Sequence, residues 1–190
     1  MVTTRPQPFP LVTARLRLRP FQEGDIAAFT AYRADPDVAR YQSWESFSVE
    51  DGLRFWERQR ERAFAVADTW FQVAIADLET DALLGDLALH FLADPRQVEL
   101  GFTLAPAQQG RGIAREAIRR MLDWLLTEGE VHRVHAVTDA LNEPAHRLLR
   151  GLGFRQEAHH IENIFFKGAW GDELVFALLA REWAARSDRR

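Results

Sequence analysis

The chain has 190 residues, of which 47% are hydrophobic and 27% charged, with a formal net charge of −4 at pH 7. These values are typical of a soluble globular protein of one domain, and the acidic balance excludes a global basic footprint for nucleic acid. Because the chain contains no cysteine, disulfides, a thiol nucleophile and thiolate metal sites are excluded.

The sequence carries no recognisable secretory or membrane signal. The first ten residues lack the apolar segment of a secretory signal, and no run approaches the roughly 20 apolar residues that a membrane span requires. We therefore expect a cytoplasmic protein with neither a membrane nor a nucleic-acid partner.

The spacing of apolar residues predicts seven strands and four helices. The segment 97–104 alternates apolar and polar residues as half-buried strands do, whereas 112–128 repeats apolar residues at helical spacing. Within that helix Glu116 and Arg120 are expected to pair on the outer side, and a capping-box pattern at Ser48 begins an earlier helix. The predicted strands are 11–20, 70–76, 83–91, 97–104, 131–138, 155–167 and 173–180; the predicted helices are 24–34, 48–67, 112–128 and 142–153, with turns at 36–41 and 168–172.

The order of these elements predicts a mostly antiparallel sheet with one parallel pair. Short turns at 79–81 and 94–96 join three consecutive strands into an antiparallel meander. The strand at 97–104 reaches the strand at 131–138 through a helix, and such a connection implies a parallel crossover. No repeat, linker or low-complexity segment divides the chain, so one domain over residues 1–190 is expected.

The stretch 108–120 (QQGRGIAREAIRR) places Gly110 and Gly112 where a turn enters a helix. Backbone N–H groups at a helix start are unpaired and carry the positive end of the helix dipole, and glycine lets an anion approach the backbone closely. The arrangement suits a phosphate or pyrophosphate. It is neither a P-loop nor a full dinucleotide fingerprint, and a plain helix start is an equal alternative on the glycines alone.

Two motifs in this sequence resemble those of the GCN5-related N-acetyltransferases, the GNAT family. Residues 109–114 (QGRGIA) fit its Q/R-x-x-G-x-G/A motif, and Asn142 followed by Leu152-Gly153-Phe154 resembles its second signature. The start at 15–20 and the end at 166–173 are similar to the branch of ribosomal-protein-alanine N-acetyltransferases. The resemblance covers about residues 11–183 and implies an α+β fold with a seven-stranded sheet, a splayed parallel pair and about four helices.

The resemblance implies acetyl-CoA as co-substrate and direct acetyl transfer to a primary amine, on a protein N-terminus or a small molecule. In the family's fold, backbone N–H groups of the glycine motif grip the coenzyme A pyrophosphate, and two strands separate to receive the pantetheine arm. Asn142 would contact that arm, although capping its helix explains it equally well. The expected coenzyme-binding residues are Phe102, Thr103, Leu104, Gln109, Gly110, Arg111, Gly112, Ile113, Ala114, Arg115 and Asn142.

Acyl transfer from a thioester to an amine needs a base for the amine, a donor for the oxyanion and an acid for the thiolate. Glu99 is the candidate base: it is expected on the strand face opposite Val98 and Leu100, and in the family's fold this strand points residues at the acceptor site. A charged strand residue in solvent is the alternative. The backbone N–H of Phe102 is the candidate oxyanion donor. Members of the branch often carry serine where this chain has Ala145, so the thiolate acid is His146, a tyrosine from elsewhere, or water.

The acceptor is not specified by these motifs. The first helices and the last hairpin are expected to bind it, with Tyr41, Trp44, Phe165 and Trp170 lining a cleft or packing as core, and Glu45, Glu162 and Asp172 attracting a cation. His132, His135, His159 and His160 form no H-E-x-x-H pattern and are expected at the surface or the acceptor rim, so no metal is expected. Two further functions stay open: a non-catalytic acyl-CoA sensor, suggested by Ala145, and transfer of another acyl group such as succinyl. The family implies a homodimer.

Overall fold

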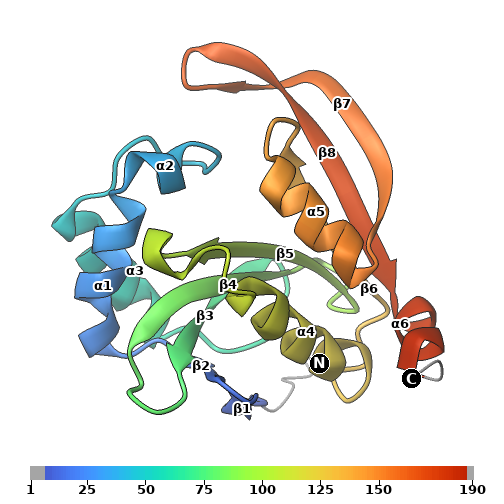
Figure 1. The fold of residues 1–190 in the computed structure, drawn as a ribbon, viewed down its shortest axis with the longest axis horizontal. Coiled ribbons are helices and arrows are strands. Elements are labelled where there is room, and N and C mark those ends of the chain that lie inside the picture. Colours follow the sequence, from blue (N-terminus) through green and yellow to red (C-terminus); the bar gives the residue numbers. More distant parts are fainter. Residues whose placement is uncertain (1–6, 188–190) are drawn as a thin grey trace.

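A single eight-stranded sheet runs through the computed structural model, which describes residues 7–187 (Figure 1). The strand order is β1-β2-β3-β4-β5-β6-β8-β7, and neighbours pair antiparallel except β5 and β6, which pair in parallel. The predicted mixed fold with one parallel pair is confirmed. The strands are β1 (Leu11–Val12), β2 (Leu16–Pro20), β3 (Thr69–Asp77), β4 (Leu83–Phe91), β5 (Gln97–Leu104), β6 (Arg133–Asp139), β7 (Arg155–Phe166) and β8 (Ala169–Leu179).

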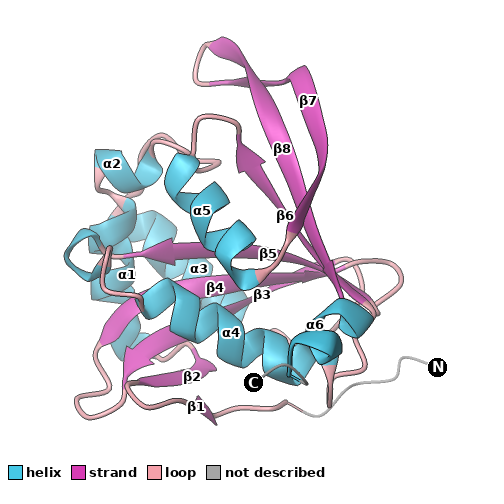
Figure 2. Cartoon of the chain, turned by 45° about the vertical axis from the view of Figure 1, so that its right-hand side comes forward, coloured by secondary structure: helices cyan, strands magenta, loops and turns pink. Residues whose placement is uncertain are grey.

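Helices pack on the sheet, and two separate apolar clusters form beneath them (Figure 2). The larger cluster contains Ile118 of α4 and Leu149 of α5, both fully buried. The smaller contains Phe29 of α1. The consecutive β3 residues Val73 and Ala74 belong to different clusters, so the clusters lie on opposite faces. The helices are α1 (Ile26–Arg33), α2 (Pro36–Ala39), α3 (Val49–Arg60), α4 (Ile113–Leu126), α5 (Glu143–Leu152) and α6 (Ala180–Ser187), with 3₁₀ turns at Glu23–Asp25 and Pro106–Gln108.

The parallel pair β5–β6 is short, and the sheet divides where it ends. Only Gln97–Glu99 of β5 pair with Arg133–His135 of β6. Beyond these residues β5 stays paired to β4 and β6 stays paired to β8. Figure 1 shows β7 and β8 rising away from the β3–β5 part of the sheet, so the sheet opens on the carboxyl side of Glu99.

Eight strands replace the predicted seven because residues 11–20 fold back on themselves. The N–H of Thr13 donates to the carbonyl of Leu16 (2.9 Å), and the N–H of Leu16 donates to Thr13 Oγ1 (2.9 Å). β1 and β2 then pair with Leu11 opposite Leu18. The turn contains no glycine or proline, so the alternation of these residues predicted one strand instead of two.

The limits of α3 and β8 also differ from the prediction. α3 ends at Arg60, not near Ala67, and Ala65 has a φ of 58°, a left-handed conformation through which a helix does not continue. β8 begins at Ala169 because Lys167 and Gly168, with φ values of 49° and 82°, form a two-residue hairpin turn.

Two helices were not predicted at all. α2 occupies the expected turn at 36–41, where the Asp35 carboxylate accepts hydrogen bonds from the N–H groups of Asp37 (2.9 Å) and Val38 (3.4 Å). α6 follows β8 directly; Trp183 packs in the larger cluster and its Nε1–H donates to Asp123 (3.0 Å). Within residues 7–187, no helix is long and apolar enough to cross a membrane.

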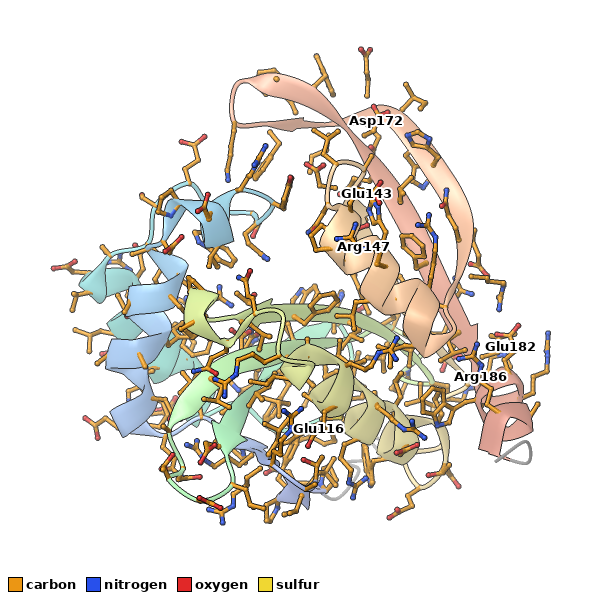
Figure 3. The ribbon with its side chains drawn as sticks, in the orientation of Figure 1. Glu116, Glu143, Arg147, Asp172, Glu182 and Arg186 are labelled. Atoms are coloured by element: carbon orange, nitrogen blue, oxygen red, sulfur yellow. The ribbon has the colours of Figure 1, made fainter. Side chains whose placement is uncertain are left out.

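Glu116, near the start of α4 (Figure 3), binds the β1–β2 turn instead of the predicted Arg120. Its carboxylate accepts a hydrogen bond from Thr13 Oγ1 (2.6 Å) and pairs with Arg15 (2.6 Å). Arg15 Nη1 also donates to the carbonyl of Arg111 (3.3 Å). These contacts tie the N-terminal hairpin to the glycine loop that precedes α4.

A buried ion pair fastens β2 to the start of α1. Arg19 donates to both carboxylate oxygens of Asp25 (2.7 and 3.0 Å), and the two side chains are 7% and 6% exposed. Arg19 Nε also donates to Asp81 (3.1 Å). The neighbouring Arg17 reaches Asp81 from a side chain that is 38% exposed.

Replacing Arg19 by Met is expected to lower the free energy of unfolding by about 3–5 kcal/mol, because Asp25 is left buried without its countercharge. Arg17→Met removes the same charge from an exposed pair and is expected to cost about 0–1 kcal/mol. Urea denaturation of both variants measures the difference. Equal losses would contradict a structural role for the buried pair.

Candidate active site

The opening between β5 and β6 holds two adjoining clefts. The first, of about 470 Å³, lies over the loop that carries Gly110 and Gly112, and we call it the glycine-loop cleft. All of the predicted coenzyme residues except Arg111 line it. The side chain of Arg111 instead donates to Gln108 (2.6 Å). The structure thus brings together β5, the glycine loop and the start of α5, as the motifs predicted.

The glycine loop has a backbone geometry that glycine adopts without strain and that most other residue types disfavour. Gly110 and Gly112 have φ values of 71° and 77°, in the left-handed region. A Cβ at Gly110 would meet nothing within 4 Å. The first backbone bond of α4 runs from the N–H of Glu116 to the carbonyl of Gly112 (3.1 Å), so the N–H groups just before it have no partner within the helix. They form the positive end of the helix dipole beside the cleft.

The backbone of β5 presents N–H groups to the opening. The N–H of Ala105 donates to Leu84, and the carbonyl of Gln97 accepts from Leu92, so odd-numbered residues direct their backbone polar groups toward β4. Alternation along the strand then directs the N–H of Phe102 toward the gap beside β6. Phe102 lines both clefts, which places this donor where they meet.

Asn142 lies at the same junction. Its side-chain oxygen caps α5 by accepting from the N–H of Ala145 (3.3 Å). Both residues line both clefts. The cap occupies the amide oxygen and leaves the amide nitrogen as a donor, so capping and ligand contact, two explanations left open by the sequence, are compatible.

The second cleft, of about 410 Å³, lies under the β7–β8 hairpin, and we call it the hairpin cleft. Within residues 7–187, its lining includes the acidic residues Asp139, Asp172 and Glu173 and no lysine, arginine or histidine. Asp172 projects from β8 in Figure 3. It accepts from His159 (2.9 Å) and from the N–H of Glu162 (2.9 Å), and these hydrogen bonds, the backbone one first, hold the pKa of Asp172 below its usual range.

The tip of the β7–β8 hairpin closes over this cleft onto α2. Lys167 Nζ donates to the carbonyl oxygens of Ala39 (2.5 Å) and Arg40 (3.3 Å). Of the aromatic residues expected at the acceptor side, Tyr41 lines the cleft. Trp44 packs in the smaller cluster instead, and Phe165 and Trp170 are 62% and 61% exposed.

Tyr41 lines both clefts, and the other tyrosine of the chain is occupied elsewhere. The sequence contains two tyrosines. Tyr32 is buried and its hydroxyl donates to Asp86. Burial and the Asp86 charge raise the pKa of Tyr32 well above its usual range. Among tyrosines, Tyr41 is therefore the one placed to donate a proton within the clefts.

The structure does not bring His146 to either cleft. Its ring is 1% exposed and tilts over Phe176, and its Nε2 lies 3.0 Å from the carbonyl oxygen of Asp139. Ala145, one residue earlier, is the one that lines the clefts. Successive helix residues point about 100° apart, so the side chain after Ala145 turns toward the sheet.

Glu99 lies on the strand face opposite Val98 and Leu100, as expected, and it sits between two histidines. Its Oε2 is 3.6 Å from His90 Nδ1 and 3.8 Å from His135 Nε2. Sequence reasoning assigned His135 to the surface or rim and did not single out His90. The predicted 83–91 and 97–104 hairpin contained the signal for His90, because its register sets His90 opposite Glu99.

Comparisons with known proteins identify the family. The family model described as "Acetyltransferase (GNAT) domain" matches residues 15–155. The chain therefore belongs to the GNAT acetyltransferases. Membership defines it as an N-acetyltransferase that depends on acetyl-CoA.

Individual relatives agree in sequence and in fold. The uncharacterized N-acetyltransferase YnaD of Bacillus subtilis is 27% identical over 173 residues, which cover 91% of this chain and 98% of YnaD. A spermidine N(1)-acetyltransferase of Vibrio cholerae is 25% identical over 177 residues, covering 93% of this chain and all of that protein (100%). The crystal structure of a GNAT-family acetyltransferase from Bacillus anthracis superposes with a TM-score of 0.82 at 26% identity, covering 90% of this chain and 99% of that one.

The residues of the glycine-loop cleft fit coenzyme A. Unpaired N–H groups at the start of α4 suit the pyrophosphate, and the unpaired edge of β5 suits the amide groups of the pantetheine arm. Arg115 and Arg147 also line the cleft and supply positive charge for phosphates. When bound, the co-substrate supplies the acetyl thioester.

Replacing Gly110 by Asp is expected to weaken coenzyme A binding by more than about tenfold, because the new carboxylate projects toward the pyrophosphate. Gly110→Asn adds a side chain of the same size as aspartate, and both residues tolerate the left-handed backbone conformation of Gly110. The difference in affinity between the two variants therefore isolates the effect of the charge. Gly24→Asp is the control, since its Cβ also meets nothing within 4 Å. Calorimetry with coenzyme A measures the affinities. Unchanged affinity of Gly110→Asp for coenzyme A would show that the pyrophosphate does not bind at this loop.

Proposed function

We propose that this protein transfers acetyl from acetyl-CoA directly to a primary amine in a ternary complex. The observation that carries the proposal is the junction of two clefts at the open end of the β5–β6 pair. Phe102, Asn142 and Tyr41 line both clefts. A pantetheine arm in the glycine-loop cleft and an amine in the hairpin cleft would meet there, beside the N–H of Phe102.

The lining of the hairpin cleft supports an amine as the acceptor. In the described part of the chain, three acidic residues and no cationic residue line it, and such a lining attracts a protonated amine. The resemblance to ribosomal-protein acetyltransferases favours a protein N-terminus, whereas the similarity to a spermidine N(1)-acetyltransferase favours a small-molecule amine. We retain both acceptor classes within the proposed function.

Glu99 is the proposed base, acting through a bridging water. Glu99 itself does not line the hairpin cleft, but Gly101, on the same strand face, does. Two residues of extended strand span about 6.6 Å, which is too far for a direct proton transfer and suits one intervening water. The N–H of Phe102 is the proposed donor to the oxyanion.

Tyr41 is the proposed acid for the leaving thiolate. The sequence left this role to His146, to a tyrosine or to water. His146 is buried beside Phe176, whereas Tyr41 lines the junction of the clefts. A phenol there can protonate the sulfur as the amide forms.

Mixing the protein with acetyl-CoA and a panel of amines is expected to release free thiol. Glu99→Gln is expected to lower kcat by about 10²–10⁴-fold, because the amide cannot accept the proton, while calorimetric affinity for acetyl-CoA is unchanged. Glu79→Gln, in the exposed β3–β4 turn, is the matched control. A Glu99→Gln variant with the wild-type rate would remove Glu99 from the role of base.

Tyr41→Phe is expected to lower kcat by roughly 10²-fold, since water then protonates the thiolate less effectively. The KM for acetyl-CoA is expected to stay the same, because the aromatic ring is kept. Thiol release under saturating substrates measures the change. An unchanged kcat would indicate that water, and not Tyr41, protonates the leaving thiolate in the wild-type protein.

A further inference from the structure

Three titratable side chains form a row across β4, β5 and β6. His90 is the cross-strand partner of Glu99, and Glu99 is the cross-strand partner of His135, so all three lie on one face. The side chains are 23%, 26% and 16% exposed, in that order. The β4–β5 and β5–β6 pairings bring the three residues together, so the row depends on the short parallel pairing.

The two imidazole rings have unsatisfied buried atoms. The Nδ1 atoms of His90 and His135 are both buried and have no hydrogen-bond partner within residues 7–187. A buried unpaired polar atom costs free energy and calls for an explanation. Trp70 stacks on His90 at 4.8 Å with an interplanar angle of 16°, which restrains the ring from rotating toward another partner.

The rings are oriented differently toward Glu99. His90 directs its buried Nδ1 to the carboxylate at 3.6 Å. Its Nε2 is not one of the buried, unpartnered atoms within residues 7–187, so this atom contacts solvent. His135 directs Nε2 to the carboxylate at 3.8 Å, and its remote Nδ1 is the buried atom. A proton can therefore leave through His90 but not through His135.

The arginines on the neighbouring strands pair with other carboxylates, so Glu99 has the two histidines as its ion-pair partners. Arg133, on β6 with His135, is paired with Glu157 of β7 (2.5 Å). Arg155, also on β7, pairs with Glu182. From the α3 side, Arg62 donates to the carbonyl of Trp70 (2.5 Å). Burial lowers the pKa of His135, an effect that the Glu99 charge partly offsets, so this environment favours the uncharged ring.

We propose that His90 relays the proton from Glu99 to solvent and that His135 is a positioning residue for the Glu99 carboxylate. The inference rests on the proposed role of Glu99. The amine proton passes through water to the carboxylate, the resulting carboxylic acid gives a proton to His90 Nδ1, and His90 releases the proton on Nε2 to water. Release from Nε2 leaves the ring protonated on Nδ1, and proton exchange with water returns it to the Nε2-protonated form before the next turnover, so each cycle moves one proton from the amine to solvent.

The relay predicts that a small acceptor in solution can replace the imidazole. Without His90, the proton on the Glu99 carboxyl has no acceptor in the position of Nδ1, so turnover falls. Imidazole added to the solution can take that proton instead.

The test measures kcat and both KM values for His90→Gln and His135→Gln, with the exposed His132→Gln as control. His90→Gln is expected to lower kcat at least about tenfold without changing either KM. In His90→Ala, added imidazole is expected to restore turnover through the space beside Trp70. His135→Gln is expected to lower kcat without rescue by imidazole.

The outcomes separate the relay from the function on which it rests. If Glu99→Gln abolishes turnover while His90→Gln and His90→Ala keep the wild-type rate, the relay is wrong and the proposed base stands. A loss of turnover in the His90 variants without imidazole rescue assigns His90 a structural role and also overturns the relay. If Glu99→Gln turns over normally, both proposals fail together.

Discussion

The end of the β5–β6 pairing is the constraint on which the rest of the site depends. Beyond Glu99 and His135, β5 is held by β4 and β6 is held by β8, so neither strand can close the gap. The N–H groups of β5 that face the gap need a partner other than β6. Both clefts lie at this opening, and the lining of the glycine-loop cleft suits a polar, extended ligand.

Polar contacts at the edge of the domain fix the walls of these clefts. Arg15 and Glu116 connect the N-terminal hairpin to the glycine loop, and Lys167 connects the β7–β8 tip to α2. The apolar core holds the sheet together, and these polar side chains fix the distance between the walls of the two clefts.

The sequence predicted most of the fold from periodicity but misplaced elements whose ends depend on turn conformation. β3, β4 and β5 were predicted within about two residues, because alternation and short turns are local signals. The β1–β2 turn at Thr13 has no glycine or proline and was missed. α3 ends at Arg60, and Ala65 beyond it adopts a left-handed conformation that its residue type disfavours, which the helical spacing of 48–67 did not predict.

The sequence by itself determined the donor side of this protein, because Gly110 and Gly112 specify a backbone conformation that needs no distant contact. It also singled out Glu99, from its place on the strand before the motif. Only the tertiary structure decided what surrounds that carboxylate, since His90 and His135 reach it through cross-strand register. The same register and helix rotation buried His146 and left Tyr41 at the junction, because side-chain direction depends on packing that one-dimensional spacing does not specify.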